Sequence, residues 1–519
     1  MTNITPESSS LLMGFIIAVL SPLFYLLYLC FYNVFLHPLR KIPGSIWTSM
    51  TPIPLFWHKI RGSSVYWVHA QHERYGPKVR VAPNEISYIN AEAWKEIYGY
   101  RKVMFQKYSP FYGKDFFAKG SETGGLLRAD DLSHARQRRL CSAAFSDKSL
   151  REQEPLLRQY VDLLVRKLSG LAKSSDKGTT IVNLVRWLNF TTFDIMADLT
   201  FAESLGLLEN SDYTTWVTSL FALFRMLTIN EVLMQIPFLK EIVPTLMPKS
   251  IQEKRKAHMQ HAVDRVDRRM KMKTERPDIW TYVLRFQNSE QDVDRGLSLD
   301  EMYSNSSSFM IAGTETSASL LSGLTYLLLR NPEKMDRLEA EILSAFPTKK
   351  DICLEKLDGL EYLDACIWEA LRCYPPLNNG MPRNPPRGGA MIGDDYVPEN
   401  TTVYVTHYSA YHSKSNFKQP DEFIPERWLK TATGFEEDNK AVFQPFSFGP
   451  RNCIGKKLAF HEMRLIFSNL IFAFDMKLGP DMKDWIKHKS FNTWEKPNLI
   501  IEITPRKEYP GGDIDLLSD

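Results

Sequence analysis

The chain has 519 residues, of which 44% are hydrophobic and 12% aromatic. It is long enough to bury a sizeable core, in one large catalytic unit or in two domains. The net charge is only +3, so the composition does not indicate a strong field for nucleic acid, and we expect no nucleic-acid partner. The six cysteines contain no C-x-x-C pair. Their spacing does not suggest a disulfide framework, which favours a reducing compartment.

The N-terminal region is strongly apolar. Residues 8–39 contain no Asp, Glu, Lys or Arg, and segment 11–31 reaches the roughly 20 apolar residues that span a bilayer core. Arg40 and Lys41 follow, which predicts a luminal N-terminus and a cytosolic body. A cleaved secretory signal is the alternative, but the apolar stretch is long and no basic residue precedes it. The expected organisation is a luminal segment (1–10), a transmembrane helix (11–31), a Pro-rich hinge (32–44), a cytosolic catalytic domain (45–504) and a flexible tail (505–519).

The body shows mostly helical periodicity, for example over 154–171 and 302–330. Between 384 and 411 the pattern becomes that of strands, with β-branched residues at 401–405 and a turn at 393–395. The segment 221–247 is rich in Leu, Ile, Phe and Met. It predicts either a second surface that dips into the membrane or two core helices. The expected fold is mainly α with a small β-sheet region.

The most informative segment runs from Phe446 to Gly455. It contains Cys453, an arginine two residues before it at Arg451, and an amphipathic helical pattern after it. A helix N-terminus favours the thiolate form of a cysteine. Gly449 and Gly455 have no Cβ and let a flat ligand approach the backbone, while Arg451 suits a carboxylate. The pattern predicts a thiolate metal site, and the alternative is that Cys453 is a small buried hydrophobic residue.

This run, F-x-x-G-x-R-x-C-x-G, resembles the haem-binding signature of the cytochrome P450 monooxygenases. The hinge sequence HPLRKIPG at 37–44 is similar to that of membrane-bound enzymes from filamentous fungi. The resemblance implies the cytochrome P450 fold and haem b as cofactor. It further implies that Cys453 is the axial thiolate ligand of the iron, with Phe446, Arg451 and Gly455 around the cofactor.

The segment Ala312–Ser317 lies within the expected helix 302–330 and matches the family pattern A-G-x-E-T-[ST]. By resemblance, Thr316 steadies iron-bound oxygen and Glu315 helps to deliver protons, so these two are the expected catalytic residues. The residues alone leave an alternative, which is a Ser/Thr-rich buried helix with an acid at its surface.

Four side chains are expected to bind the cofactor's carboxylates. His134 and Arg138 lie four residues apart on one predicted helix face, and they resemble the family's [WH]-x-x-x-R helix. Arg383 and Arg451 stand at the positions of the family's other carboxylate-binding residues. From the residues alone, the favoured interpretation is that His134 begins a helix and faces solvent.

A second set of charged residues is expected to be structural. Glu369 and Arg372 share a helix face, and the family adds an arginine from a Pro-Glu-Arg segment, here Arg427. The chain departs from the usual family pattern at Trp428, where Phe is common, and at Ala202, where Gly is common. His134 stands where Trp is the commoner residue.

Several segments are expected to surround a substrate, and most of their residues are apolar, which favours a lipophilic molecule with a few oxygen atoms. They are the aromatic stretch 105–117, Phe309 and Met310, the segment 379–381, and Asn492–Thr493. Basic side chains at Arg136, Arg139, Lys456 and Lys457 predict a surface that binds an acidic electron donor.

The sequence thus predicts a membrane-bound monooxygenase that inserts one oxygen from O₂ into a lipophilic small molecule. By resemblance this is a tailoring step of fungal secondary metabolism at the endoplasmic reticulum membrane. Electrons are expected from NADPH through NADPH–cytochrome P450 reductase, with cytochrome b5 as a second candidate donor. The alternatives are an isomerase or dehydratase of the same fold, or a non-catalytic haem-binding sensor or carrier.

Overall fold

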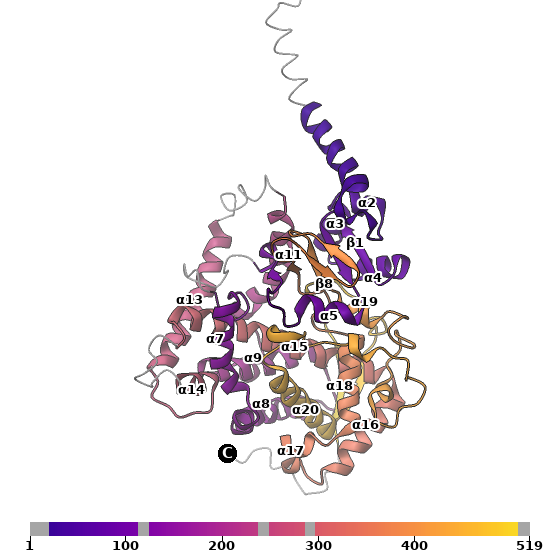
Figure 1. The fold of residues 1–519 in the computed structure, drawn as a ribbon. Helices are drawn as coiled ribbons and strands as arrows, with labels where there is room; N and C mark the ends of the chain where they lie inside the picture. The colour runs from indigo at the N-terminus through magenta and orange to yellow at the C-terminus, as the bar shows by residue number, and fades with distance from the viewer. Residues whose placement is uncertain (1–19, 113–123, 237–248, 286–295, 507–519) are drawn as a thin grey trace, which may run out of the picture.

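The structure is a computed structural model, which describes residues 20–112, 124–236, 249–285 and 296–506. Helices make up most of these residues, and the sheets are small (Figure 1). The expectation of a mainly α fold with a small β-sheet region is therefore confirmed. Parts of the predicted transmembrane segment, of the aromatic stretch and of segment 221–247, and most of the C-terminal tail, lie outside the described residues.

The described helices of eight residues or more form the bulk of the body. They are α3 (Ile53–Arg61), α4 (Ser64–Tyr75), α5 (Ala91–Tyr98), α7 (Asp131–Ser142), α8 (Asp147–Lys173), α9 (Leu184–Phe201), α11 (Thr215–Met234), α13 (Lys249–Lys271), α15 (Leu299–Leu329), α16 (Pro332–Ala345), α18 (Glu361–Cys373) and α20 (Lys456–Ala473). Shorter ones are α2 (Ile46–Met50), α6 (Ser109–Tyr112), α10 (Leu207–Asn210), α14 (Ile279–Leu284), α17 (Leu354–Leu357) and α19 (His407–Tyr411).

Helix α15 is the long central helix, and its bounds agree with the predicted helix 302–330 to within three residues. It begins with a capping box, in which Ser298 and Glu301 satisfy each other's backbone N–H groups. It packs closely against α9, because Gly313 has no side chain. A Cβ at Gly313 would lie 2.6 Å from the Met196 sulfur. The glycine thus permits the close contact of the two helices, and α15 continues through it without a break.

The strands form four small sheets. The largest has the order β1 (Lys78–Ala82), β2 (Glu85–Tyr88), β8 (Thr402–Val405), β5 (Arg383–Asn384) and β3 (Gln106–Lys107). Its β2–β8 pair is parallel, with Glu85 opposite Thr402, and the other pairs are antiparallel. A second sheet orders β4 (Thr180–Asn183), β12 (Ile500–Pro505) and β9 (Phe474–Leu478). Two hairpins pair β6 (Ala390–Ile392) with β7 (Asp395–Val397), and β10 (Ser490–Phe491) with β11 (Thr493–Trp494).

The Pro-rich hinge is fixed to the body. After residues 20–31, which are helical and extend away from the body (Figure 1), the chain forms short helical turns at Tyr32–Leu36 and Pro38–Lys41. The His37 ring contacts the Asn84 amide oxygen at 2.8 Å, and Arg80 donates to the carbonyl oxygen of Asn33 at 2.9 Å. No helix among the described residues combines the length and apolarity that a bilayer crossing needs. The predicted transmembrane helix 11–31 is therefore not supported by the described part of the chain.

Candidate active site

The Cys453 loop is a tight turn between a 3₁₀ segment at Gly449–Arg451 and α20. The Cys453 N–H donates to the Phe446 carbonyl oxygen at 2.8 Å, which closes the loop. Gly449 has φ +75°, and a Cβ there would lie 2.0 Å from the Tyr98 carbonyl oxygen. Only glycine fits this position. Cys453 is the one exposed cysteine among the six, so its sulfur is available to a ligand.

Two opposing effects act on the Cys453 thiol. The sulfur is accessible, yet protein surrounds it on most sides, and this desolvation raises its pKa. The backbone N–H of Gly455 and the charges of Arg138 and Lys456 act in the other direction and stabilise the thiolate. A bound metal cation would add the largest stabilisation, since a coordinating thiol is deprotonated. The loop therefore has the chemistry of a metal ligand site.

Aromatic packing fixes the loop on the side of α18. Phe446 meets Trp368 edge-on with ring centroids 6.4 Å apart, and Trp368 lies 4.6 Å from Phe460 of α20. The Lys456 ammonium lies over both Trp368 and Phe446, at 5.3 and 5.6 Å. Phe446 thus supports the Cys453 loop on its α18 side and also contacts the first turns of α20.

Beneath these rings lies the predicted structural network, with all its charged side chains fully buried. Glu369 accepts from Arg372 at 2.8 Å and from Arg427 at 3.1 Å. Arg427 also pairs with Asp438 at 2.6 Å, a partner that the sequence analysis missed. Arg372 saturates its remaining N–H groups on backbone carbonyl oxygens, including that of Tyr411 at 2.9 Å. The Arg372 and Arg427 charges lower the pKa of Glu369 despite its burial.

The four predicted carboxylate-binding residues gather on the other side of the loop. His134 and Arg383 are buried, and Arg138 donates to the Asn452 side chain at 2.6 Å. Arg451 pairs with Asp131 at 2.7 Å through one nitrogen, while its Nη1 atom is buried with no hydrogen-bond partner among the described residues. The structure thus brings these side chains to one place, next to Cys453.

Lys107 joins these four side chains, and we define the cationic cluster as His134, Arg138, Arg383, Arg451 and Lys107; Tyr112 borders it. Lys107 of β3 donates to the carbonyl oxygens of Ala129 at 3.3 Å and Leu126 at 3.4 Å. The Tyr112 ring lies 5.7 Å from the Arg383 guanidinium, and its hydroxyl is buried without a described partner. The sequence analysis did not identify Lys107, because a single lysine in an aromatic segment belongs to no recognisable motif.

The pKa shifts in the cluster reflect an excess of positive charge over the single carboxylate of Asp131. Burial, followed by the charges of Arg451 and Arg383, lowers the pKa of Lys107 to about 6. Burial and the charges of Arg451, Lys107 and Arg138 lower the pKa of His134 to about 3. The buried Arg451 Nη1 atom and Tyr112 hydroxyl have no partner among the described residues, and they lie beside the guanidinium groups of the cluster. Such a site is suited to a dianionic ligand.

Thr316 and Glu315 of α15 point in different directions. Ala312 is exposed, and Gly313 and Thr316 are half-buried, so this face of α15 is the accessible one. The Thr316 hydroxyl donates back to the Ala312 carbonyl oxygen at 2.6 Å. Glu315 is buried and forms an ion pair with Lys496, while Ser319 donates to it at 3.2 Å. Lys496 is a partner that the sequence analysis missed, since 181 residues separate it from Glu315.

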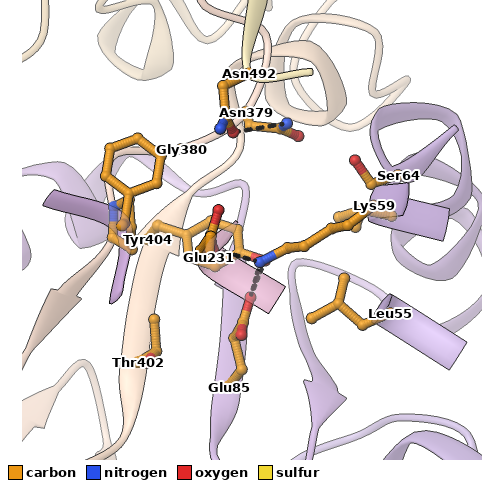
Figure 2. Close-up of a pocket in the computed structure, with 13 residues that line it drawn as sticks. Leu55, Lys59, Ser64, Glu85, Glu231, Asn379, Gly380, Thr402, Tyr404 and Asn492 are labelled. Carbon is orange, nitrogen blue, oxygen red and sulfur yellow. Dashed lines mark hydrogen bonds and ion pairs between the residues drawn. The ribbon is translucent and has the colours of Figure 1, made fainter. Parts of the chain in front are cut away.

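Some expected pocket residues meet around a small cavity (Figure 2). Phe111, Asn379, Gly380 and Asn492 line it, together with Glu231 of α11. Its walls also carry charge, from Lys59, Glu85 and Glu231. Phe309 and Met310 do not line this cavity. Both are buried, and Phe309 packs edge-on against Phe145 with ring centroids 5.6 Å apart.

The four basic side chains expected on one surface have different surroundings. Lys456 and Lys457 are exposed, but Lys457 pairs with Asp147 at 2.6 Å. They border a groove of about 480 Å³ whose lining also includes acidic side chains. Arg136 instead pairs with Glu301 at the start of α15, where it links α7 to that helix. Arg139 is exposed.

Comparison with known proteins agrees with this geometry. A family model described as Cytochrome P450 matches residues 48–501. The chain belongs to the cytochrome P450 family.

Its relatives are monooxygenases. The chain is 44% identical over 486 residues to cytochrome P450 monooxygenase efuB of Hormonema carpetanum, covering 93% of this chain and 94% of the relative. It is 39% identical over 478 residues to cytochrome P450 monooxygenase astA of Talaromyces wortmannii, covering 92% and 94%. It is 37% identical over 505 residues to averantin hydroxylase of Dothistroma septosporum, covering 96% and 93%. This cytochrome P450 is thus an enzyme of the monooxygenase class.

The residues present fit the haem that the family implies. Cys453 is accessible as a thiolate ligand, and the cationic cluster beside it suits two carboxylates. The unpartnered Arg451 Nη1 atom and Tyr112 hydroxyl are donors that such carboxylates would satisfy. Gly449 and Gly455 keep the loop backbone open to a flat macrocycle.

Proposed function

We propose that this cytochrome P450 is a membrane-bound monooxygenase that oxidises a lipophilic small molecule in fungal secondary metabolism. The observation that carries the proposal is the accessible Cys453 next to a cationic cluster with two unpartnered donors. The reaction takes a C–H bond, O₂, two electrons and two protons to an alcohol and water. The similarity to fungal monooxygenases, averantin hydroxylase among them, supports a tailoring oxidation.

In the proposed reaction, different residues of the chain have different roles. When bound, haem supplies O₂ binding and activation at an iron whose reactivity the Cys453 thiolate increases. Arg138, Arg383, Arg451 and His134 orient the cofactor through its carboxylates. On the accessible face of α15, the Thr316 hydroxyl would exchange a proton with water beside the cofactor. Glu315 lies one residue away, and its carboxylate accepts hydrogen bonds from Lys496 and Ser319.

The proposed location is the endoplasmic reticulum membrane, with a single N-terminal span and a cytosolic catalytic domain. Exposed apolar side chains support a lipid contact. Phe24, Tyr25 and Leu27 of the N-terminal helix are 70%, 60% and 58% exposed. Trp47 and Ile53 of α2 and α3 are 65% and 66% exposed, so the apolar surface continues onto the body.

The proposed electron donor is NADPH–cytochrome P450 reductase, a membrane-bound flavoprotein, with cytochrome b5 as a second candidate. The exposed Arg139 and Lys456, together with Lys457, support an encounter with an acidic protein surface near Cys453. The acidic side chains in the neighbouring groove restrict this surface to the side where α7 ends and α20 begins.

A carbon monoxide spectrum tests the proposal. The purified, haem-loaded protein is reduced and exposed to carbon monoxide, and we expect the strongly red-shifted Soret band that an anionic sulfur ligand produces. In Cys453→His, haem retention without this band is the expected result. A wild-type protein that retains haem but lacks the band would overturn the proposal.

Labelling with ¹⁸O₂ separates the monooxygenase from the alternatives. An isomerase or dehydratase would form a product without label, whereas a monooxygenase would form a product with one labelled oxygen atom. A haem-binding sensor or carrier would consume NADPH, if at all, without forming an oxidised product. Metabolite profiles of a deletion strain would supply the candidate substrates.

A further inference from the structure

Three charged side chains meet in a nearly buried cluster between α3, β2 and α11 (Figure 2). The Lys59 ammonium donates to Glu231 Oε1 at 2.8 Å and lies 3.7 Å from Glu85 Oε1. The three side chains are only 14%, 5% and 4% exposed, for Lys59, Glu231 and Glu85 respectively. When all are ionised, two carboxylates share one ammonium, so the cluster carries an uncompensated negative charge.

The cluster forms one wall of a cavity of about 20 Å³. A cavity needs roughly 10–15 Å³ to hold one water molecule, so this space suits a single small polar group such as an ammonium or a hydroxyl. Further polar groups surround it. Tyr404 donates to Glu85 at 2.8 Å, and Asn379 donates to Asn492 at 3.5 Å (Figure 2).

The cavity lies next to the active site. Asn379, Gly380 and Pro382 line it, and the same segment continues to Arg383 in the cationic cluster. An extended chain spans at most about 3.5 Å per residue, which limits the distance from Asn379 to Arg383 to about 14 Å. Phe111 also lines the cavity, while its neighbour Tyr112 approaches Arg383.

We infer that Lys59, Glu85 and Glu231 bind the hydrogen-bond-donating end of the substrate, an ammonium or a hydroxyl group, and so direct oxidation to a carbon remote from that end. The inference rests on the proposed function. In a site of low dielectric constant, the surplus carboxylate attracts a cation or donor strongly. A substrate carboxylate would face the same surplus charge and is disfavoured.

The charge balance distinguishes this cluster from a structural ion pair. Arg269 and Asp278 form such a pair elsewhere, buried to 2% and 0% exposure, with one carboxylate for one guanidinium. Asp278 accepts from two nitrogens of Arg269, at 2.6 and 2.9 Å. In the Lys59, Glu85 and Glu231 cluster, the two carboxylates share Lys59 as their one cationic partner among the described residues. Burial and the charge of Glu231 raise the pKa of Glu85, and Lys59 and Tyr404 only partly offset this.

The test uses the haem-loaded, full-length protein and dodecylamine as probe. When the ammonium occupies the cluster, the alkyl end lies towards the iron, and displacement of a water ligand shifts the Soret band to shorter wavelength. An amine that binds the iron through nitrogen shifts the band to longer wavelength. We expect the first result for the wild type and the second for the double variant Glu85→Gln/Glu231→Gln.

Affinities give a second readout. A hydrogen bond to a charged group contributes about 1.5–3 kcal/mol, so we expect the double variant to bind dodecylamine in the short-wavelength mode about 10-fold or more weakly. We expect the wild type to bind dodecanoate about 10-fold more weakly than dodecylamine. Glu209→Gln is the matched control, because its carboxylate is 68% exposed and pairs with Lys167 on the surface. It should leave both affinities unchanged.

The outcomes separate the inference from the proposed function. If the wild type shows the long-wavelength shift, or binds dodecanoate as tightly as dodecylamine, the inference is wrong. The carbon monoxide band of each variant reports folding and thiolate ligation independently. A wild type without that band overturns the proposed function and the inference with it. The single variant Glu231→Gln provides a milder change if the double variant fails to fold, and it should show the same trend.

Discussion

Single residues determine how the Glu315 carboxylate of α15 is held. Glu315 is buried and paired with Lys496, and its Oε2 atom is without a described hydrogen-bond partner. The orientation of the carboxylate therefore depends on Lys496 and Ser319, which both contact Oε1. Lys496 is therefore a positioning residue for Glu315.

Removal of the lysine alone should be costly. Lys496→Met leaves the Glu315 carboxylate buried without its cation, and breaking a buried pair costs about 3–5 kcal/mol. The double variant Glu315→Gln/Lys496→Met removes the charge as well and should recover most of that loss. Urea unfolding of the haem-loaded protein measures both values. The double variant should nevertheless form less product per NADPH, since the proton route is lost.

A surface pair provides the control for this experiment. Lys457 and Asp147 are 56% and 62% exposed and pair at 2.6 Å. Lys457→Met should cost about 0–1 kcal/mol, because exposed ion pairs contribute little. Equal losses for Lys457→Met and Lys496→Met would contradict the assigned burial of the Glu315–Lys496 pair.

At the scale of elements, the structure gives a physical reason for two departures from the family pattern, at Trp428 and Ala202. Trp428 stands where Phe is common, and its indole N–H donates to the buried Glu369 at 2.8 Å. The larger ring thus adds a hydrogen bond to the network that supports the Cys453 loop. Ala202 follows α9 with φ +57°, in the left-handed region where glycine has no steric penalty. The glycine common in the family suits this conformation better.

Ala202→Gly should therefore stabilise the protein. A non-glycine residue in the left-handed conformation costs roughly 1–2 kcal/mol, partly offset by the greater freedom of glycine in the unfolded chain. We expect a net gain of about 1 kcal/mol, measured by urea unfolding. The same exchange inside α9, Ala197→Gly, should have the opposite sign, because glycine in a helix interior loses about 1 kcal/mol. Destabilisation by both exchanges would contradict the argument.

At the scale of the whole molecule, local motifs could be predicted and distant pairings could not. Cys453, Arg451 and Gly455 belong to one short run, so their proximity follows from the sequence. Helix α15 was predicted because its periodicity extends over about eight turns. By contrast, Lys496 meets Glu315 across 181 residues, and Lys59 meets Glu231 across 172. No spacing rule connects such residues, since only the packing of helices and sheet brings them together.

The cationic cluster also makes cofactor retention depend on pH. In the protein alone, Lys107 has a pKa lowered to about 6, so it is mostly neutral at pH 8. A bound carboxylate raises that pKa, and binding then takes up a proton. Haem affinity should therefore be greatest near pH 6 and fall as the pH rises towards 8.5. Transfer of haem to apomyoglobin at several pH values measures this dependence of haem affinity on pH.

Lys107→Met should weaken haem binding near pH 6 and flatten the pH dependence, whereas Lys456→Met, outside the cluster, should keep the wild-type slope. Equal slopes in all three proteins would remove Lys107 from the cofactor site.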